Sequence, residues 1–126
     1  MTDNKQLKIL IVEDCQTFRG IAVQILKGHD NILTDTASDA IVKFRSKQPD
    51  ITFLDIELPD GNGIDVLKQI KEIEPNAYVV MMTGSNKAKD VESSINSGAA
   101  GYILKPFNAE IVQRMVSEFI EKNQES

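Results

Sequence analysis

The amino-acid sequence predicts an α/β fold in which five βα units form one doubly wound parallel sheet. The first observation is a set of five short apolar runs, several of them apolar at consecutive positions, as in strands that helices cover on both faces. These runs span residues 8–12, 31–34, 51–54, 78–82 and 101–104. The second observation is the helical spacing of apolar residues between the runs, which fits the crossovers that parallel strands require. We therefore expect the strand order 2-1-3-4-5.

The first two helices have clear ends in the sequence. The first has apolar residues at the spacing of one buried helix face. These residues are Phe18, Ile21, Ala22, Ile25 and Leu26. Gly28 stands where a left-handed residue would end this helix. The second helix runs from about Ser38 to Lys47, and Pro49 stops it because the residue before a proline disfavours helical backbone angles.

The other three helices have patterns of unequal strength. The third contains Ile64, Leu67, Ile70 and Ile73 and stops before Pro75. The fourth has the weakest pattern, with only Ala88, Val91 and Ile95 before Gly98. The last contains two adjacent apolar rows, Ile111, Met115 and Phe119 beside Val112, Val116 and Ile120. Because this stripe is wide, we expect part of the Val112, Val116 and Ile120 row to be exposed and to contact a partner protein.

Length and composition limit the classes of protein that the chain can represent. Its 126 residues, of which 41% are hydrophobic, suit one globular domain over residues 1–126, with no separate output domain. The single cysteine excludes an intrachain disulfide, and no signal peptide or membrane-spanning run is present, so we expect a cytoplasmic protein without membrane insertion. The net charge of −5 and the scattered basic residues argue against direct nucleic-acid binding.

Polar residues follow four of the predicted strands directly. Glu13 and Asp14 follow the first strand, Asp55 the third, Thr83 the fourth and Lys105 the fifth. Ligands of open α/β sheets bind outside the carboxyl ends of the strands, where these residues would meet. Like charges brought together either raise each other's proton affinity or require a cation, and oxygen ligands suit Mg²⁺ or a similar hard ion.

The same set of residues suits phosphoryl chemistry. A phosphoryl group matches a hard cation, the Lys105 ammonium and the Thr83 hydroxyl. Since an Asp carboxylate can be the nucleophile that forms an aspartyl-phosphate, Asp55 is the candidate acceptor. Lys105–Pro106 is expected to be a cis peptide bond, because the cis form costs little before proline and the turn would direct Lys105 into the site.

Five stretches at these strand ends resemble the receiver domains of two-component signalling, the CheY-like superfamily with the flavodoxin-like strand order. They are Ile11-Val12-Glu13-Asp14, Phe53-Leu54-Asp55-Ile56-Glu57-Leu58-Pro59, Asn62-Gly63, Met82-Thr83-Gly84 and Leu104-Lys105-Pro106-Phe107. The resemblance covers nearly the whole chain. It implies that Asp55 takes a phosphoryl group from the phosphohistidine of a sensor histidine kinase or a histidine phosphotransfer protein.

The resemblance also implies a role for each residue around Asp55. Mg²⁺, or Mn²⁺, would be bound by Asp14, Asp55 and the backbone carbonyl of Glu57, with Glu13 helping directly or through water. Thr83 and Lys105 would bind phosphoryl oxygens, and Tyr102 would be the switch aromatic. Phosphorylation would then change a surface formed by the fourth helix, the fifth strand and the fifth helix, which binds a downstream protein. Such a receiver is modified once and dephosphorylates slowly, so it is not a turnover enzyme.

The sequence departs from the family pattern after Asp55. Gly61 and Asn62 stand where the family usually has an apolar residue and an Asp, so we expect a more mobile loop. Glu57, two residues after the acceptor, occupies a position that varies in the family and tunes the lifetime of the phosphoryl group. Its carboxylate either repels incoming anions or contacts the metal.

The same residues allow other interpretations. Asp55-Ile56-Glu57 partly matches the Asp-x-Asp motif of phosphatases that resemble the haloacid dehalogenase family, although the acidic pair here precedes the nucleophile. A flavodoxin-like or dinucleotide-binding protein is disfavoured because no Gly-x-Gly-x-x-Gly follows the first strand. Cys15 is interpreted as a small residue at a helix start rather than a redox sensor, and His29 as a surface residue rather than a metal ligand.

Overall fold

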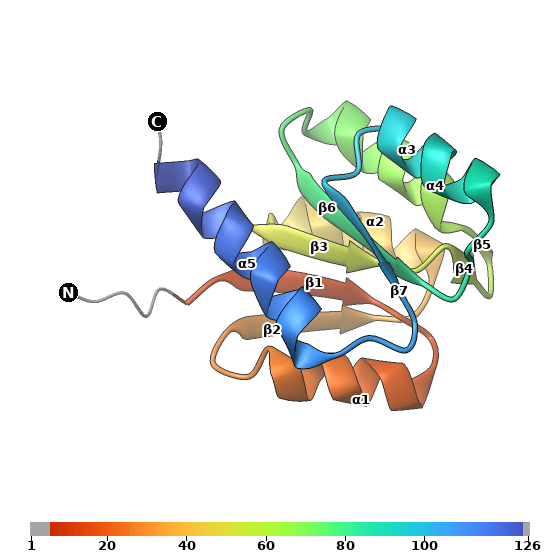
Figure 1. Ribbon diagram of the computed structural model, residues 1–126. Coiled ribbons are helices and arrows are strands. Elements are labelled where there is room, and N and C mark those ends of the chain that lie inside the picture. The colour runs from red at the N-terminus through yellow and green to blue at the C-terminus, as the bar shows by residue number, and fades with distance from the viewer. Residues whose placement is uncertain (1–5, 125–126) are drawn as a thin grey trace.

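The computed structural model describes residues 6–124 and contains the predicted parallel sheet (Figure 1). Its strands are β1 (Lys8–Val12), β2 (Asp30–Thr34), β3 (Ile51–Leu54), β6 (Tyr78–Thr83) and β7 (Gly101–Leu104). The order β2-β1-β3-β6-β7 is the expected 2-1-3-4-5, because β4 (Glu57–Leu58) and β5 (Gly61–Asn62) form a separate two-stranded hairpin. The sequence pattern did not predict this hairpin.

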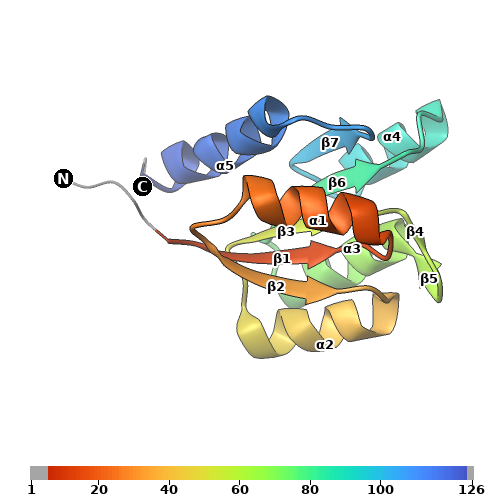
Figure 2. The ribbon, with the colours of Figure 1, turned by 90° about the horizontal axis from the view of Figure 1, so that it is seen from below.

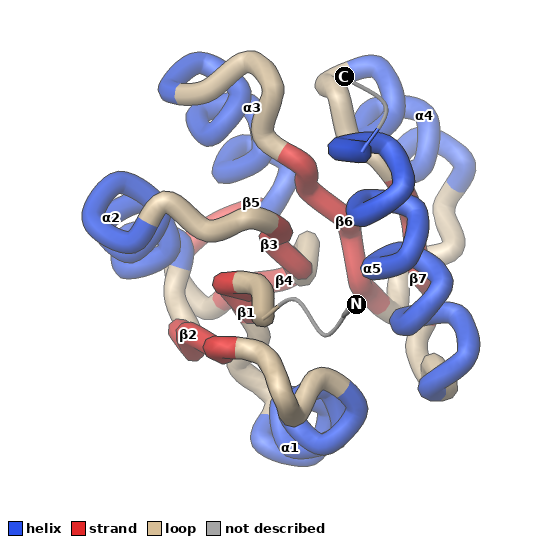
Figure 3. The backbone as a smooth tube through the Cα atoms, turned by 90° about the vertical axis from the view of Figure 1, so that its left-hand side faces the viewer, coloured by secondary structure: helices blue, strands red, loops and turns tan. Residues whose placement is uncertain are grey.

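Five helices cover the two faces of the sheet. They are α1 (Gln16–Ile25), α2 (Ala37–Lys47), α3 (Gly63–Ile73), α4 (Ala88–Asn96) and α5 (Ala109–Gln124). Figures 2 and 3 show α1 and α5 on one face and α2 and α3 on the other. Alternate residues of β1 serve the two layers: Leu10 and Val12 pack with α2 and α3, whereas Ile9 and Ile11 pack with α1 and α5. Strands with two buried faces explain the consecutive apolar runs of the sequence.

The expected partner stripe on α5 is wrong for two of its three residues, Val112 and Val116. Val112 is fully buried and Val116 is 7% exposed, because both side chains join the core between α5, α1 and the sheet, and Ile120 is half-buried.

The apolar face expected on α4 is also wrong at one residue. Ile95 is 51% exposed, and the small Ser94 is buried in its place. The exposed large apolar residues on α4 and β7 are therefore Ile95 and Leu104.

The chain after Asp55 is held by side chains that bond to helix amides. Asp60 accepts hydrogen bonds from the backbone N–H groups of Ala37 (2.6 Å) and Ser38 (3.1 Å) at the start of α2. Asn62 accepts one from the N–H of Ile64 (2.7 Å) and so caps α3. These bonds connect the β4–β5 hairpin to two helices, while its greater mobility stays a prediction.

Asp60 makes a contribution to the free energy of unfolding that depends on pH. The hydrogen bonds from Ala37 and Ser38 lower the pKa of the Asp60 carboxyl. A lowered pKa in the folded state stabilises the fold above the unfolded value of about 3.9, and this contribution is lost as the pH falls through the folded value. We expect Asp60→Asn to lower the urea midpoint at pH 7, with a smaller difference from wild type at about pH 3. Glu72→Gln is the control, and an equal difference at both pH values would contradict this account.

Two residues interpreted in the sequence have modest structural roles. Cys15 is half-buried at the N-cap of α1, and its side chain makes no capping hydrogen bond. His29 is half-buried, and its Nδ1 accepts a hydrogen bond from the N–H of Leu7 at 3.1 Å, so it connects the turn before β2 to the chain before β1.

None of the helices described between residues 6 and 124 has the length and apolar character that a bilayer span requires.

Candidate functional site

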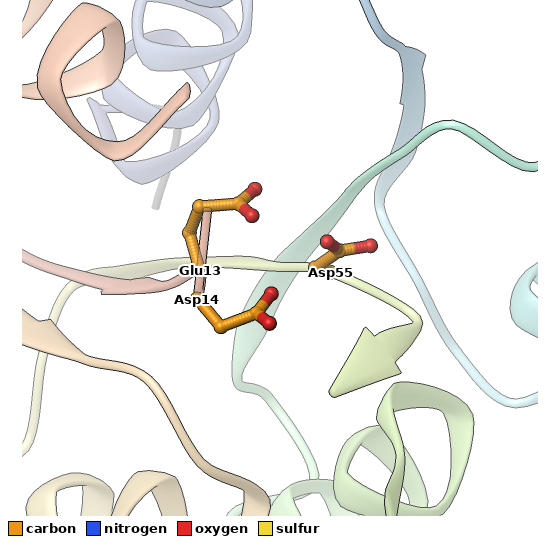
Figure 4. Close-up of side chains that lie close together, drawn as sticks. All are labelled: Glu13, Asp14 and Asp55. Atoms are coloured by element: carbon orange, nitrogen blue, oxygen red, sulfur yellow. The ribbon is translucent and has the colours of Figure 1, made fainter. Parts of the chain in front are cut away.

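Three carboxylates gather at the carboxyl edge of the sheet. Glu13 and Asp14 follow β1, Asp55 follows β3, and one oxygen of each lies within 4.8 Å of the others. Figure 4 shows the three carboxylates directed into the same region. Glu13 and Asp55 are buried, whereas Asp14 is exposed. Among residues 6–124 this is the only such group of three or more metal-ligating acidic, histidine or cysteine side chains.

Backbone pairing brings these residues together. In the register of the sheet, Val12 of β1 lies beside Leu54 of β3, so the residues that follow each strand emerge side by side. The pairing continues past the strands, because the N–H of Asp55 donates to the carbonyl of Val12 at 3.1 Å and the N–H of Glu13 donates to that of Thr34 at 3.0 Å. The backbone hydrogen bonds of the sheet therefore position the site residues, rather than a long flexible loop.

Lys105 lies against two of the carboxylates. Its Nζ is 2.8 Å from Oδ2 of Asp55 and 2.8 Å from Oε1 of Glu13, and its side chain is only 10% exposed. The backbone places it: the N–H of Lys105 donates to the carbonyl of Thr83 at 2.8 Å, and the Lys105–Pro106 bond is cis. The predicted cis peptide is thus confirmed.

The pKa values of Glu13 and Lys105 are both raised, but for different reasons. Burial raises the pKa of Glu13, with the nearby charge of Asp55 adding to it and Lys105 opposing it. For Lys105, burial alone would lower the pKa, but the hydrogen bonds and charges of Asp55 and Glu13 together raise it. Lys105 is therefore a fixed positive charge at neutral pH, and the buried carboxylates are its counterions.

Thr83 and Tyr102 are connected through the loop after β6. Thr83 is fully buried, and its Oγ1 accepts a hydrogen bond from the N–H of Ser85 at 3.4 Å. The Tyr102 hydroxyl donates to the carbonyl of Ser85 at 2.8 Å, and its ring is half-buried. Ser85 also donates from Oγ to Asp90 on α4 at 2.5 Å. Ser85 thus contacts the residues that a switch would need, although no sequence pattern singles it out.

Glu57 lies at the start of the β4–β5 hairpin. Its N–H donates to Oδ1 of Asp55 at 3.2 Å, so the two oxygens of Asp55 have different partners, Glu57 and Lys105. The Glu57 side chain is exposed. Nearby, the backbone of Asp55 leaves no space for a side chain at Gly63, because a Cβ atom there would overlap the Asp55 carbonyl oxygen.

Phe18 is a site residue that its helical spacing assigned only to the core. Its ring centroid lies 4.7 Å from Lys105 Nζ. Phe18 is the third residue of α1, whose first turn follows Glu13 and Asp14. Its place in the first turn of a helix that follows the acidic pair was the available signal that Phe18 lies near the strand ends.

The fold and the site define a class of protein: a doubly wound α/β domain with carboxylates, a hydroxyl and an ammonium group at the carboxyl edge of its sheet. The model of the response regulator receiver domain family matches residues 9–117. The chain belongs to this family, whose members receive signals in two-component systems. The match favours a receiver over a phosphatase similar to the haloacid dehalogenase family.

Relatives and solved structures agree with this assignment. The chemotaxis protein CheY of Listeria monocytogenes is 35% identical over 109 residues, which cover 84% of this chain and 92% of the relative. The CheY-like receiver domain protein of Methanospirillum hungatei superposes with a TM-score of 0.89 at 27% identity, covering 97% of this chain and 100% of that one. A chain of the CheX–CheY–BeF3–Mg²⁺ complex of Borrelia burgdorferi has a TM-score of 0.82 at 27% identity, covering 90% of this chain and 88% of that one.

Proposed function

We propose that Asp55 is the phosphoryl acceptor of this receiver and that phosphorylation depends on a divalent metal. The observation that carries the proposal is the contact of Lys105 with a buried Asp55 beside Glu13 and Asp14. An oxygen of the Asp55 carboxylate attacks phosphorus while the bond from phosphorus to the donor nitrogen breaks, and the donor histidine keeps the electron pair. The donor is a sensor histidine kinase or a histidine phosphotransfer protein.

The donor set fits Mg²⁺, or Mn²⁺, because it consists of carboxylate oxygens with one exposed member that an ion can reach. Asp14, Asp55 and the backbone carbonyl of Glu57 would hold the ion, with Glu13 helping directly or through water. When bound, the ion supplies positive charge that offsets the charge of the transferred group. Lys105 supplies a further positive charge, and the hydroxyl of Thr83 donates a hydrogen bond to a phosphoryl oxygen.

The output of the domain is a change in the surface of α4, β7 and α5. A phosphoryl oxygen draws the Thr83 hydroxyl towards Asp55, which alters its contact with Ser85 and therefore the position of the Tyr102 ring. Ile95 and Leu104 are the exposed apolar residues with which this surface would meet a downstream protein. The domain spans residues 1–126, acts in the cytoplasm and is modified once rather than turning over substrate.

Intact-mass spectrometry with acetyl phosphate tests the proposal. Acetyl phosphate with Mg²⁺ is expected to add one phosphoryl group, and a chelator is expected to prevent this because the ion's positive charge is removed. Peptide mapping should place the group on Asp55. Steady turnover of an aryl phosphate, or labelling that persists in the chelator, would contradict the proposal.

Thr83→Ala separates acceptance of the phosphoryl group from the response to it. The variant keeps Asp55 and Lys105, so it is expected to accept a phosphoryl group, but it lacks the hydroxyl that contacts Ser85. We expect it to lose most of the phosphorylation-dependent change in NMR shifts across α4 and β7. Thr83→Ser is the control, because it retains the hydroxyl. A response like that of the wild type in Thr83→Ala would show that Thr83 and Tyr102 are not coupled.

A further inference from the structure

The Lys105 ammonium has a third neighbour in addition to its two carboxylates. The Phe18 ring lies over Nζ with its centroid 4.7 Å away, while Asp55 and Glu13 each approach Nζ to 2.8 Å. A cation at this distance from an aromatic face is attracted by the ring quadrupole, and the attraction is stronger where water is excluded. With the Lys105 side chain only 10% exposed, this contact is largely shielded from solvent.

Phe18 is itself held in place by a second ring. Its centroid lies 5.8 Å from that of Phe107, with the two planes inclined at 39°. Phe107 follows Lys105 by two residues, directly after Pro106. The ring pair therefore connects α1 to the segment of chain that carries Lys105, and it restricts the ammonium from the side of α1.

Phosphorylation changes one partner of Lys105 and leaves the ring unchanged. Before the reaction Nζ contacts Oδ2 of Asp55, and after it that carboxylate carries the phosphoryl group, so the ammonium must contact phosphoryl oxygens. A flexible lysine side chain loses conformational freedom when it is held for this task. The ring reduces that cost at the moment of reaction, because it restricts the position of the ammonium beforehand.

We propose that Phe18 is a positioning residue for phosphoryl transfer, whose ring holds the Lys105 ammonium over Asp55 by a cation–π interaction. This rests on the proposed role of Asp55 as the acceptor. The ring does not touch the transferred group; it acts through Lys105.

Variants of Phe18 separate the effect of the aromatic face from that of apolar packing. Phe18→Leu keeps an apolar side chain but removes the π face, and the rate of labelling by acetyl phosphate with Mg²⁺ is expected to fall about tenfold. Phe18→Tyr keeps the face and is expected to label within about twofold of wild type. Phe119→Leu is the matched control, since Phe119 packs on Tyr78 and not on Lys105.

The NMR chemical shifts of Lys105 give a second measurement, which a purely structural role of Phe18 in packing would not change. A ring over Nζ shifts the Lys105 side-chain proton resonances upfield, and this shift is expected to persist in Phe18→Tyr and Phe119→Leu but to vanish in Phe18→Leu. Phe18→Met serves as the second variant if Phe18→Leu does not fold. A wild-type labelling rate in the folded Leu or Met variant, or unmoved Lys105 resonances, would overturn the proposal. Absence of labelling in the wild type would instead overturn the role of Asp55, and the resonances would still report whether the ring contacts Lys105.

Discussion

Asp55→Asn is expected to reduce labelling by acetyl phosphate to about 1% of the wild-type level or less, while the domain still folds. The amide oxygen of Asn is a far weaker nucleophile than a carboxylate, so the bond to phosphorus cannot form at a useful rate. The shape of the side chain is almost unchanged, and an Asn oxygen can still accept the hydrogen bond from the N–H of Glu57. Lys105 retains its ion pair with Glu13.

The measurement is intact-mass spectrometry after incubation with acetyl phosphate and Mg²⁺, together with a urea titration that shows a cooperative unfolding transition. Asp65→Asn is the control, because it makes the same chemical change at an exposed position of α3 outside the carboxylate group. Labelling of Asp55→Asn at the level of Asp65→Asn would end the assignment of Asp55 as the acceptor. Labelling lost through unfolding would appear as a missing transition.

Gly63→Ala is expected to cost about 3 kcal/mol of unfolding free energy. A Cβ atom at this position would overlap the carbonyl oxygen of Asp55 and would lie 2.8 Å from its carbonyl carbon. Both atoms are backbone, so no side-chain rotation relieves the overlap. The start of α3 would have to move away, which strains the hydrogen bond from the N–H of Gly63 to the carbonyl of Ile56 at 2.6 Å.

Gly20→Ala is the matched control for this substitution. Gly20 lies inside α1, and a Cβ atom added there would have nothing within 4 Å outside its own helix backbone and chain neighbours, so the methyl group meets open space. Alanine favours the helix over glycine, and this variant is expected to gain about 1 kcal/mol. Urea unfolding of the two variants and the wild type measures both effects. A Gly63→Ala variant as stable as Gly20→Ala would show that α3 shifts at little cost.

The fold could be predicted because each strand has a local signal. Strands with two buried faces are apolar at consecutive positions, and the glycines expected near the ends of the first and fourth helices, Gly28 and Gly98, both have positive φ angles of 101°. The convergence of Glu13, Asp14 and Asp55 followed from strand order alone, because parallel strands end at a common edge. These features depend on residues that are neighbours in the chain or on one rule of topology.

The features that the sequence did not predict have a common physical cause. Helical periodicity shows that a face of α5 is apolar, but not how deeply the helix sinks between the sheet and α1, so the burial of Val112 and Val116 was missed. The same holds for Phe18, whose role depends on where Lys105 extends from a strand far along the chain. Asp60 likewise bonds to amides more than twenty residues earlier. Contacts between distant side chains leave no periodic trace in a sequence.

The contacts of Ser85 have a consequence for the speed of the response. Its N–H contacts Thr83 and its carbonyl accepts a hydrogen bond from Tyr102, so in the proposed switch Ser85 would connect Thr83 to the Tyr102 ring. Rearrangement of a short loop takes nanoseconds to microseconds, whereas domain movements take microseconds to milliseconds. A switch that rearranges only this loop is therefore expected to follow the phosphorylation state within microseconds. Under the proposed function, the duration of a signal would then be set by the hydrolysis rate of the acyl phosphate on Asp55.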